Sequence, residues 1–217
     1  MKSKGKPKGW ITRNGVHIPI YDNYTVERNE PKARIKKSTK FSEEKYKHIN
    51  PGYKQDKGHL DKDGFNNNCA MCAVAFEANM RGEDTEANAF KFGYPEYVKK
   101  SKHVNEAFGV KDYDIVMIND KKADMRLTRL KQHMEDWNDG DRGILQTWGN
   151  NSRHVMNVLY DKGKMIIVDA QAGTHEDITN AKNSKLLKGT VRIDVSKVSD
   201  KPIDKEYAEW AYKKRGK

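Results

Sequence analysis

The sequence contains two cysteines, Cys69 and Cys72, three positions apart and directly after a run of asparagines. A structural zinc site needs four nitrogen or sulfur ligands, and the chain offers no second C-x-x-C pair and no H-x₃₋₅-H motif. A thioredoxin-type pair would follow a strand, whereas a polar loop precedes this one. We therefore expect neither a metal site nor a cofactor. Two alternatives remain: a pair of small buried residues on a helix, or a catalytic nucleophile.

The position of Cys69 favours the nucleophile. Apolar residues recur at helical spacing from here through Phe76 and Met80, and Gly82 follows as a helix-ending residue. Asn68 is a typical N-cap residue, which makes Cys69 the first residue of the predicted helix. The free N–H groups and the dipole at a helix start stabilise a thiolate, which is the reactive form of a cysteine.

A cysteine nucleophile needs a base, and the base needs an acceptor that orients it. His154 begins the apolar segment HVMNVLY, and Asp169 ends the next apolar segment, MIIVD, 15 positions later. This spacing is typical of a hairpin, and the two ends of a hairpin lie near each other in an antiparallel ladder. Cysteine, histidine and aspartate also follow the chain order of papain-like enzymes. We therefore expect Cys69, His154 and Asp169 to form a catalytic triad.

The elements that position these residues follow from periodicity and turn signals. Further helices are expected over Glu96–Phe108 and Arg126–Trp137, with a short one near the C-terminus, in KEYAEWAYKKRGK. The last third alternates in hydrophobicity and predicts antiparallel strands in GILQTWG, in HVMNVLYDKGKMIIVDAQAG, which turns at Asp161–Lys164, and in TVRIDV. Helices followed by a sheet indicate an α+β domain.

The N-terminal part differs from the rest in charge. Of a net charge of +11, residues 1–50 carry +8. Gly9–Tyr21 predicts a short hairpin that turns at Asn14–Gly15, and residues 22–48 resemble a linker. We therefore divide the chain into a basic arm, 1–48, and a catalytic domain, 49–217. The arm is suited to an acidic partner or nucleic acid, although a merely solubilising tail is the alternative.

The hydrophobicity pattern indicates whether the chain enters or crosses a membrane. Apolar stretches such as Met165–Val168 are only as long as a strand, so we expect no membrane span. The N-terminus MKSKGKPKGW has no apolar core, so we expect no signal peptide. A cytoplasmic protein is the expectation.

Five motifs occur in an order that resembles a known family. They are INPG, NNCAMCAVAFEANMRG, GDRGILQTW, RHVMNVLY and DAQAG, within residues 49–175. The chain resembles the papain-fold toxin family, which includes bacterial effector glutamine deamidases, and still more the related domains attached to phage head proteins. The resemblance implies a papain-like α+β fold, in which an N-terminal helix carrying the cysteine packs on an antiparallel sheet carrying the histidine and aspartate.

The resemblance also implies roles for single residues. Cys69 is the nucleophile, His154 the general base and acid, and Asp169 the residue that orients His154. Cys72 is a neighbour able to trap Cys69 as a disulfide, and it is the minority candidate for the nucleophile because true papains use the second cysteine of this motif. Gln171 is expected near the site. Asn68 is expected to assist the oxyanion hole. The chain departs from the family where Val155 replaces an aromatic residue.

Three interpretations follow. The favoured one is a cysteine amidohydrolase that acts on protein amides, as a glutamine deamidase of the toxin or effector type or as a phage-encoded domain. A cysteine protease of the same fold is the alternative that shares its chemistry. A non-enzymatic phage module that binds a partner is the third, although a binding role does not need all of Cys69, His154 and Asp169. Nucleic-acid binding rests on charge alone.

Overall fold

The computed structural model describes residues 9–13, 16–20, 40–53, 63–120, 122–149 and 152–216. The chain divides into two compact units, residues 1–33 and 34–217. In the first unit, β1 (Gly9–Arg13) and β2 (Val16–Ile20) form the antiparallel hairpin that the sequence predicts. The predicted turn at Asn14–Gly15 and residues 22–39 of the predicted linker lie outside the described residues.

The second unit is built on one antiparallel sheet with the strand order β4-β9-β5-β6-β7-β8. Its strands are β4 (Val116–Asn119), β5 (Arg142–Trp148), β6 (Arg153–Asp161), β7 (Lys164–Asp169), β8 (Thr174–Asp177) and β9 (Arg192–Lys197). Among the described residues, the α-helices are α1 (Cys69–Met80), α2 (Pro95–Lys102), α3 (Ala123–Met134) and α4 (Lys205–Ala211). A small antiparallel pair, β3 (Thr85–Ala87) with β10 (Tyr212–Lys214), completes the unit. None of the helices in the described ranges is long and apolar enough to span a membrane.

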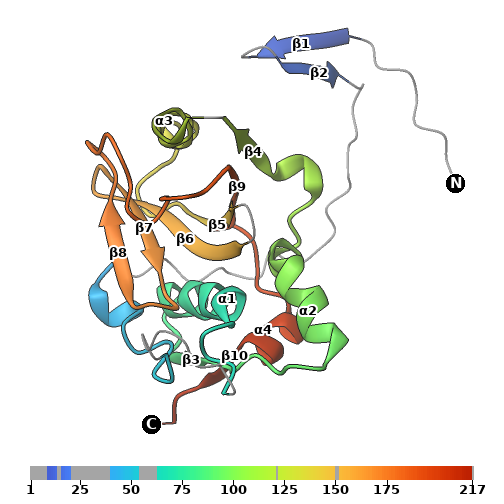
Figure 1. The fold of residues 1–217 in the computed structure, drawn as a ribbon, viewed down its shortest axis with the longest axis vertical. Coiled ribbons are helices and arrows are strands. Elements are labelled where there is room, and N and C mark those ends of the chain that lie inside the picture. The colour runs from blue at the N-terminus through green and yellow to red at the C-terminus, as the bar shows by residue number, and fades with distance from the viewer. Residues whose placement is uncertain are drawn as a thin grey trace, which may run out of the picture. The chain divides into compact units, whose positions relative to one another are not determined.

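Helices cover both faces of the sheet. Along β5, Ile144 belongs to the hydrophobic cluster that includes α1, and the next residue, Leu145, belongs to the cluster that includes α3. This alternation is the two-residue period of a strand that is buried on both faces. Figure 1 shows α1 along one face of the sheet, and α1 also contacts α4 and β3 on its other side. The fold is therefore α+β, with the cysteine helix at the centre.

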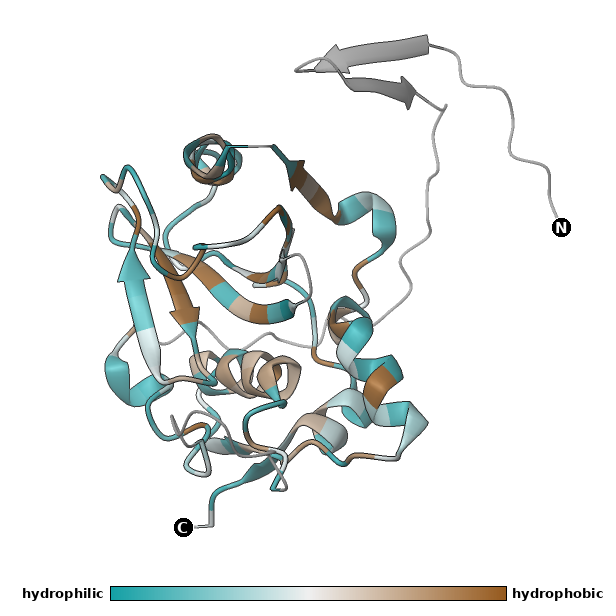
Figure 2. Ribbon diagram, viewed as in Figure 1, coloured by the Kyte–Doolittle hydropathy of each residue, from teal (hydrophilic) through white to brown (hydrophobic). Residues whose placement is uncertain are grey.

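Helix α1 is buried almost all round, since every residue from Ala70 to Met80 is buried. Figure 2 shows α1 in hydrophobic tones over most of its length. A helix that is apolar on all sides belongs inside a protein, and its four alanines allow neighbouring elements to approach closely. The sequence predicts this helix and its end before Gly82 correctly.

Other predicted elements shift in the structure. The helix expected over Glu96–Phe108 breaks at His103 into α2 and a 3₁₀ segment, Val104–Phe108. The helix expected over Arg126–Trp137 is α3, which begins and ends three residues earlier. The domain boundary expected at residue 49 stays a prediction, but Tyr46 is already buried in the core of the second unit, where the partly buried Phe41 stacks on it. Part of the predicted linker therefore packs against the domain.

A buried ion-pair network fixes α1 on the sheet. The Glu77 side chain is fully buried, and its carboxylate accepts hydrogen bonds from Arg142 Nε of β5 at 3.1 and 3.2 Å. It also accepts one from Arg81, at the end of the helix, at 3.4 Å. The two guanidinium groups donate further to the carbonyl groups of Gly140, Val198 and Lys201. One carboxylate therefore joins the helix, the central sheet and the segment after β9.

We expect Glu77→Ala to destabilise the fold by about 3–5 kcal/mol, because it leaves two buried guanidinium groups without their anion. Glu209→Ala is the matched control, since the side chain of Glu209 is 68% exposed and pairs only with Lys205. The control should cost no more than about 0.5 kcal/mol. Urea unfolding followed by circular dichroism measures both values, and equal losses in the two variants would contradict the structural role given to Glu77.

Candidate active site

His154 and Asp169 meet as the hairpin spacing predicts. His154 is the second residue of β6, Asp169 is the last residue of β7, and His154 Nε2 lies 2.8 Å from Asp169 Oδ2. The other carboxylate oxygen, Oδ1, accepts hydrogen bonds from the backbone N–H groups of Gln171 and Ala172, both at 3.1 Å. The carboxylate is therefore held from two sides, and it fixes the plane of the imidazole ring.

Cys69 begins α1 as predicted, is partly exposed, and lies near enough to His154 to raise the pKa of its imidazole. Because Asp169 occupies Nε2, the ring nitrogen left for Cys69 is Nδ1. Burial lowers the pKa of His154, but the hydrogen bonds with Asp169 and Cys69 outweigh burial and raise the pKa to about 10. The imidazole is therefore protonated at neutral pH, beside the carboxylate of Asp169.

Cys72 lies in a different environment. Its side chain is 1% exposed, and Sγ donates to Asn68 Oδ1 at 3.3 Å. Burial raises the pKa of the Cys72 thiol well above its ordinary value, and the nearby charges of Cys69 and Asp169 raise it further. Both cysteines are free thiols in the structure. These properties favour Cys69 over Cys72 as the reactive sulfur.

A buried network of side-chain amides holds the start of α1. Asn68 Nδ2 donates to Asn50 Oδ1 at 3.0 Å and to the carbonyl of Asn88 at 3.1 Å. Asn68 Oδ1 accepts from Gln171 Nε2 at 3.2 Å, and Asn50 Nδ2 donates to the carbonyl of Gln171 at 3.1 Å. The network joins the N-P-G turn, the residue before Cys69 and the loop after Asp169. The motifs INPG, NNCAMCAVAFEANMRG and DAQAG are therefore in direct contact.

The structure corrects one expectation about Asn68. It occupies the N-cap position, but its side chain makes no capping hydrogen bond to the helix. The oxygen that would accept a capping hydrogen bond, Oδ1, accepts from Gln171 Nε2 and Cys72 Sγ instead. Both amide hydrogens of Asn68 are given to Asn50 and Asn88, so neither is left for an oxyanion. The first backbone N–H groups of α1, which have no partner within a helix, are the donors that remain near Cys69.

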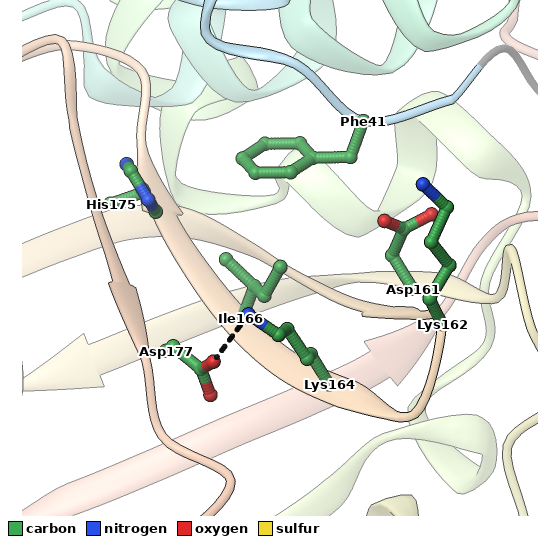
Figure 3. A pocket seen from close by; sticks show the side chains of 7 residues that line it. All are labelled: Phe41, Asp161, Lys162, Lys164, Ile166, His175 and Asp177. Atoms are coloured by element: carbon green, nitrogen blue, oxygen red, sulfur yellow. Dashed lines mark ion pairs between the residues drawn. The ribbon is translucent and has the colours of Figure 1, made fainter.

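A separate pocket, shown in Figure 3, lies toward the turn of the β6–β7 hairpin, at the end opposite to His154 and Asp169. Its lining residues are Phe41, Asp161, Lys162, Lys164, Ile166, His175 and Asp177. Its volume of about 260 Å³ is below the range typical of ligand sites. His175 Nδ1 lies 2.7 Å from the hydroxyl oxygen of Tyr46, so this histidine is engaged away from the cysteines.

Sequence reasoning missed the role of Asn50 and Asn88. Asn50 was noted only as part of a turn, although a buried asparagine beside Pro-Gly needs hydrogen-bond partners. Asn88 carries no local signal, because its carbonyl group reaches Asn68 only in the folded chain. Arg153, directly before His154, was not singled out either.

A helix that begins with a partly exposed cysteine, packed on an antiparallel sheet that supplies histidine and aspartate, defines a papain-like cysteine hydrolase fold. Residues 67–174 match the model of a family described as papain fold toxin 1, glutamine deamidase. This part of the chain belongs to that family, and it includes Cys69, His154 and Asp169. No curated protein matches the chain.

We expect a thiol-reactive probe such as iodoacetamide to label Cys69 well before Cys72 near neutral pH, since Cys72 is buried and its thiol resists ionisation. Mass spectrometry of digested protein locates the label. The Cys69→Ala variant is the control, and it should take up label only after denaturation. Equal labelling of the two cysteines in the folded protein would show that Cys69 has no special reactivity.

Proposed function

We propose that the protein is a cysteine amidohydrolase that deamidates glutamine side chains of a target protein. The hydrogen-bonded pair of His154 and Asp169 near Cys69, in a domain of the glutamine deamidase family, is the observation that carries this proposal. Cys69 attacks the carboxamide carbon as the thiolate, beside the protonated ring of His154, and backbone N–H groups at the start of α1 bind the oxygen that becomes negative. His154 then gives its proton to the departing nitrogen, and ammonia leaves a thioester on Cys69.

Water completes the reaction. It attacks the thioester carbon, and His154, now neutral, accepts a proton from it. The carbon–sulfur bond breaks, the thiolate reforms beside the protonated imidazole, and the glutamine has become a glutamate. The raised pKa of His154 suits this cycle, because the resting ring already holds the proton that the leaving nitrogen needs. Asp169 keeps the ring in position throughout.

The proposed reaction is tested by incubating a protein mixture with the wild-type protein in water enriched in ¹⁸O. Deamidation should place ¹⁸O in glutamate residues that replace glutamines, and tryptic peptide mass spectrometry locates these sites. The Cys69→Ala variant is the control, because it reveals spontaneous deamidation. Label at new chain ends instead would indicate a protease of the same fold, and label at neither position would contradict both forms of the hydrolase.

Variants of Asp169 and His154 test the triad. Asp169→Asn retains an acceptor oxygen and should keep part of the activity, whereas Asp169→Ala removes the acceptor and should cost on the order of 100-fold. His154→Ala should be as damaging as Cys69→Ala, because members of such a unit act together. A folded, fully active His154→Ala protein would contradict the proposed triad.

The pH profile adds an independent test. Burial lowers the pKa of His154, but Asp169 and Cys69 together raise it to about 10, so wild-type activity should persist at alkaline pH and fall only as the ring loses its proton near that value. Asp169→Asn removes the charge, so its alkaline limb should move to lower pH. An unchanged alkaline limb would show that His154 is not the group that titrates there.

A further inference from the structure

Arg153 is the residue directly before His154, at the start of β6. It pairs with Trp148 of β5, and its guanidinium carbon lies 4.7 Å from the centre of the Trp148 ring. The guanidinium also donates to the carbonyl of Lys102, at the end of α2, at 2.6 Å, and to the side-chain oxygen of Gln146. An aromatic ring and two fixed acceptors therefore hold this arginine in one position beside the candidate active site.

The guanidinium of Arg153 makes no direct ion pair with the described residues, although the charge of Asp194 acts on it from a greater distance. Both of its hydrogen-bond acceptors are neutral, and no carboxylate in the described part of the chain lies within ion-pair distance of it. Its Nε atom is buried and has no partner among the described residues. A buried donor without an acceptor is costly in a folded protein.

Arg192 provides the contrast within the same cluster. Its guanidinium carbon also lies over the Trp148 ring, 5.1 Å from the ring centre. However, two of its nitrogens bind the carboxylate of Asp194 at 2.6 and 2.7 Å, so its charge is neutralised. Of the two arginines on Trp148, Arg192 bonds directly to Asp194, whereas Arg153 has only neutral hydrogen-bond partners among the described residues.

Arg153 is also close enough to the reactive sulfur for their charges to interact. Burial lowers the pKa of Arg153, and the charge of Cys69 is the largest of the influences that raise it. The free charge of Arg153 therefore acts on groups that approach Cys69.

Building on the proposed function, we propose that Arg153 forms a subsite that binds an acidic side chain of the target protein next to the glutamine that Cys69 attacks. A planar guanidinium suits a carboxylate, and a charge-assisted hydrogen bond to the buried Nε would satisfy the donor that lacks a partner. The bound carboxylate would then hold the neighbouring amide carbon over the sulfur. The net charge of +11 favours the same targets, because it attracts acidic protein surfaces.

The subsite is tested by the alkylation of Cys69 with two reagents of similar size. Iodoacetate carries a carboxylate and iodoacetamide is neutral, and in both reactions the sulfur forms a bond to carbon as iodide leaves. We expect Arg153→Gln to lower the ratio of the iodoacetate rate to the iodoacetamide rate by about threefold to tenfold, the effect of one nearby charge. Arg153→Lys should restore most of the ratio.

Lys182→Gln is the matched control, because it removes the same charge from an exposed position between β8 and β9. Its ratio should equal that of the wild-type protein. If Arg153 only stabilised the thiolate, Arg153→Gln would slow both reagents equally, and an unchanged ratio would overturn the subsite. Folding of each variant is checked by thermal unfolding.

This experiment does not depend on deamidation. Absence of glutamine conversion in the ¹⁸O experiment would therefore reject the proposed function while leaving the alkylation ratio to decide the subsite. Conversely, the protein could deamidate glutamine while Arg153→Gln leaves the alkylation ratio unchanged. That result would support the proposed function and reject the subsite.

Discussion

The buried carboxylate of Glu77 is the interaction on which the position of the cysteine helix depends. It joins α1 to Arg142 of the central strand β5 and to Arg81 at the end of the same helix. An ion pair without access to water is stable only while all of its partners stay in place. The helix therefore has little freedom to slide or rotate on the sheet. Cys69, the first residue of this helix, is therefore fixed in position relative to strands β6 and β7.

At the N-terminal end of α1, neutral side-chain amides hold the helix in place. Asn50, Asn68 and Gln171 share hydrogen bonds that connect the N-P-G turn with the loops on either side of the site. The same loop supplies the backbone N–H groups that hold Asp169. A charged network at the C-terminal end of α1 and a neutral one at its N-terminal end thus place Cys69 against His154 without a metal ligand or disulfide among the described residues.

The sequence predicted the parts of this arrangement that have local signals. Gly82 marked the end of α1, and the apolar segments around Asp161–Lys164 marked the hairpin that brings His154 to Asp169. The burial of Glu77 could not be predicted, because charged residues are usually exposed and its partner Arg142 is distant in sequence. The short strands β4 and β8 were missed because four residues carry too little alternation. The engagement of the Asn68 amide depends on tertiary contacts alone.

The central claim is that the fold holds a protonated imidazole between Cys69 and Asp169 in the resting protein. Nitrogen NMR of ¹⁵N-histidine-labelled protein measures this directly, with His154→Ala used to assign the signal. Both ring nitrogens of His154 are expected to carry a proton at neutral pH, and one proton should be lost only near pH 10. A His154 ring that titrates near its ordinary pKa of about 6.5 would contradict the proposed resting state.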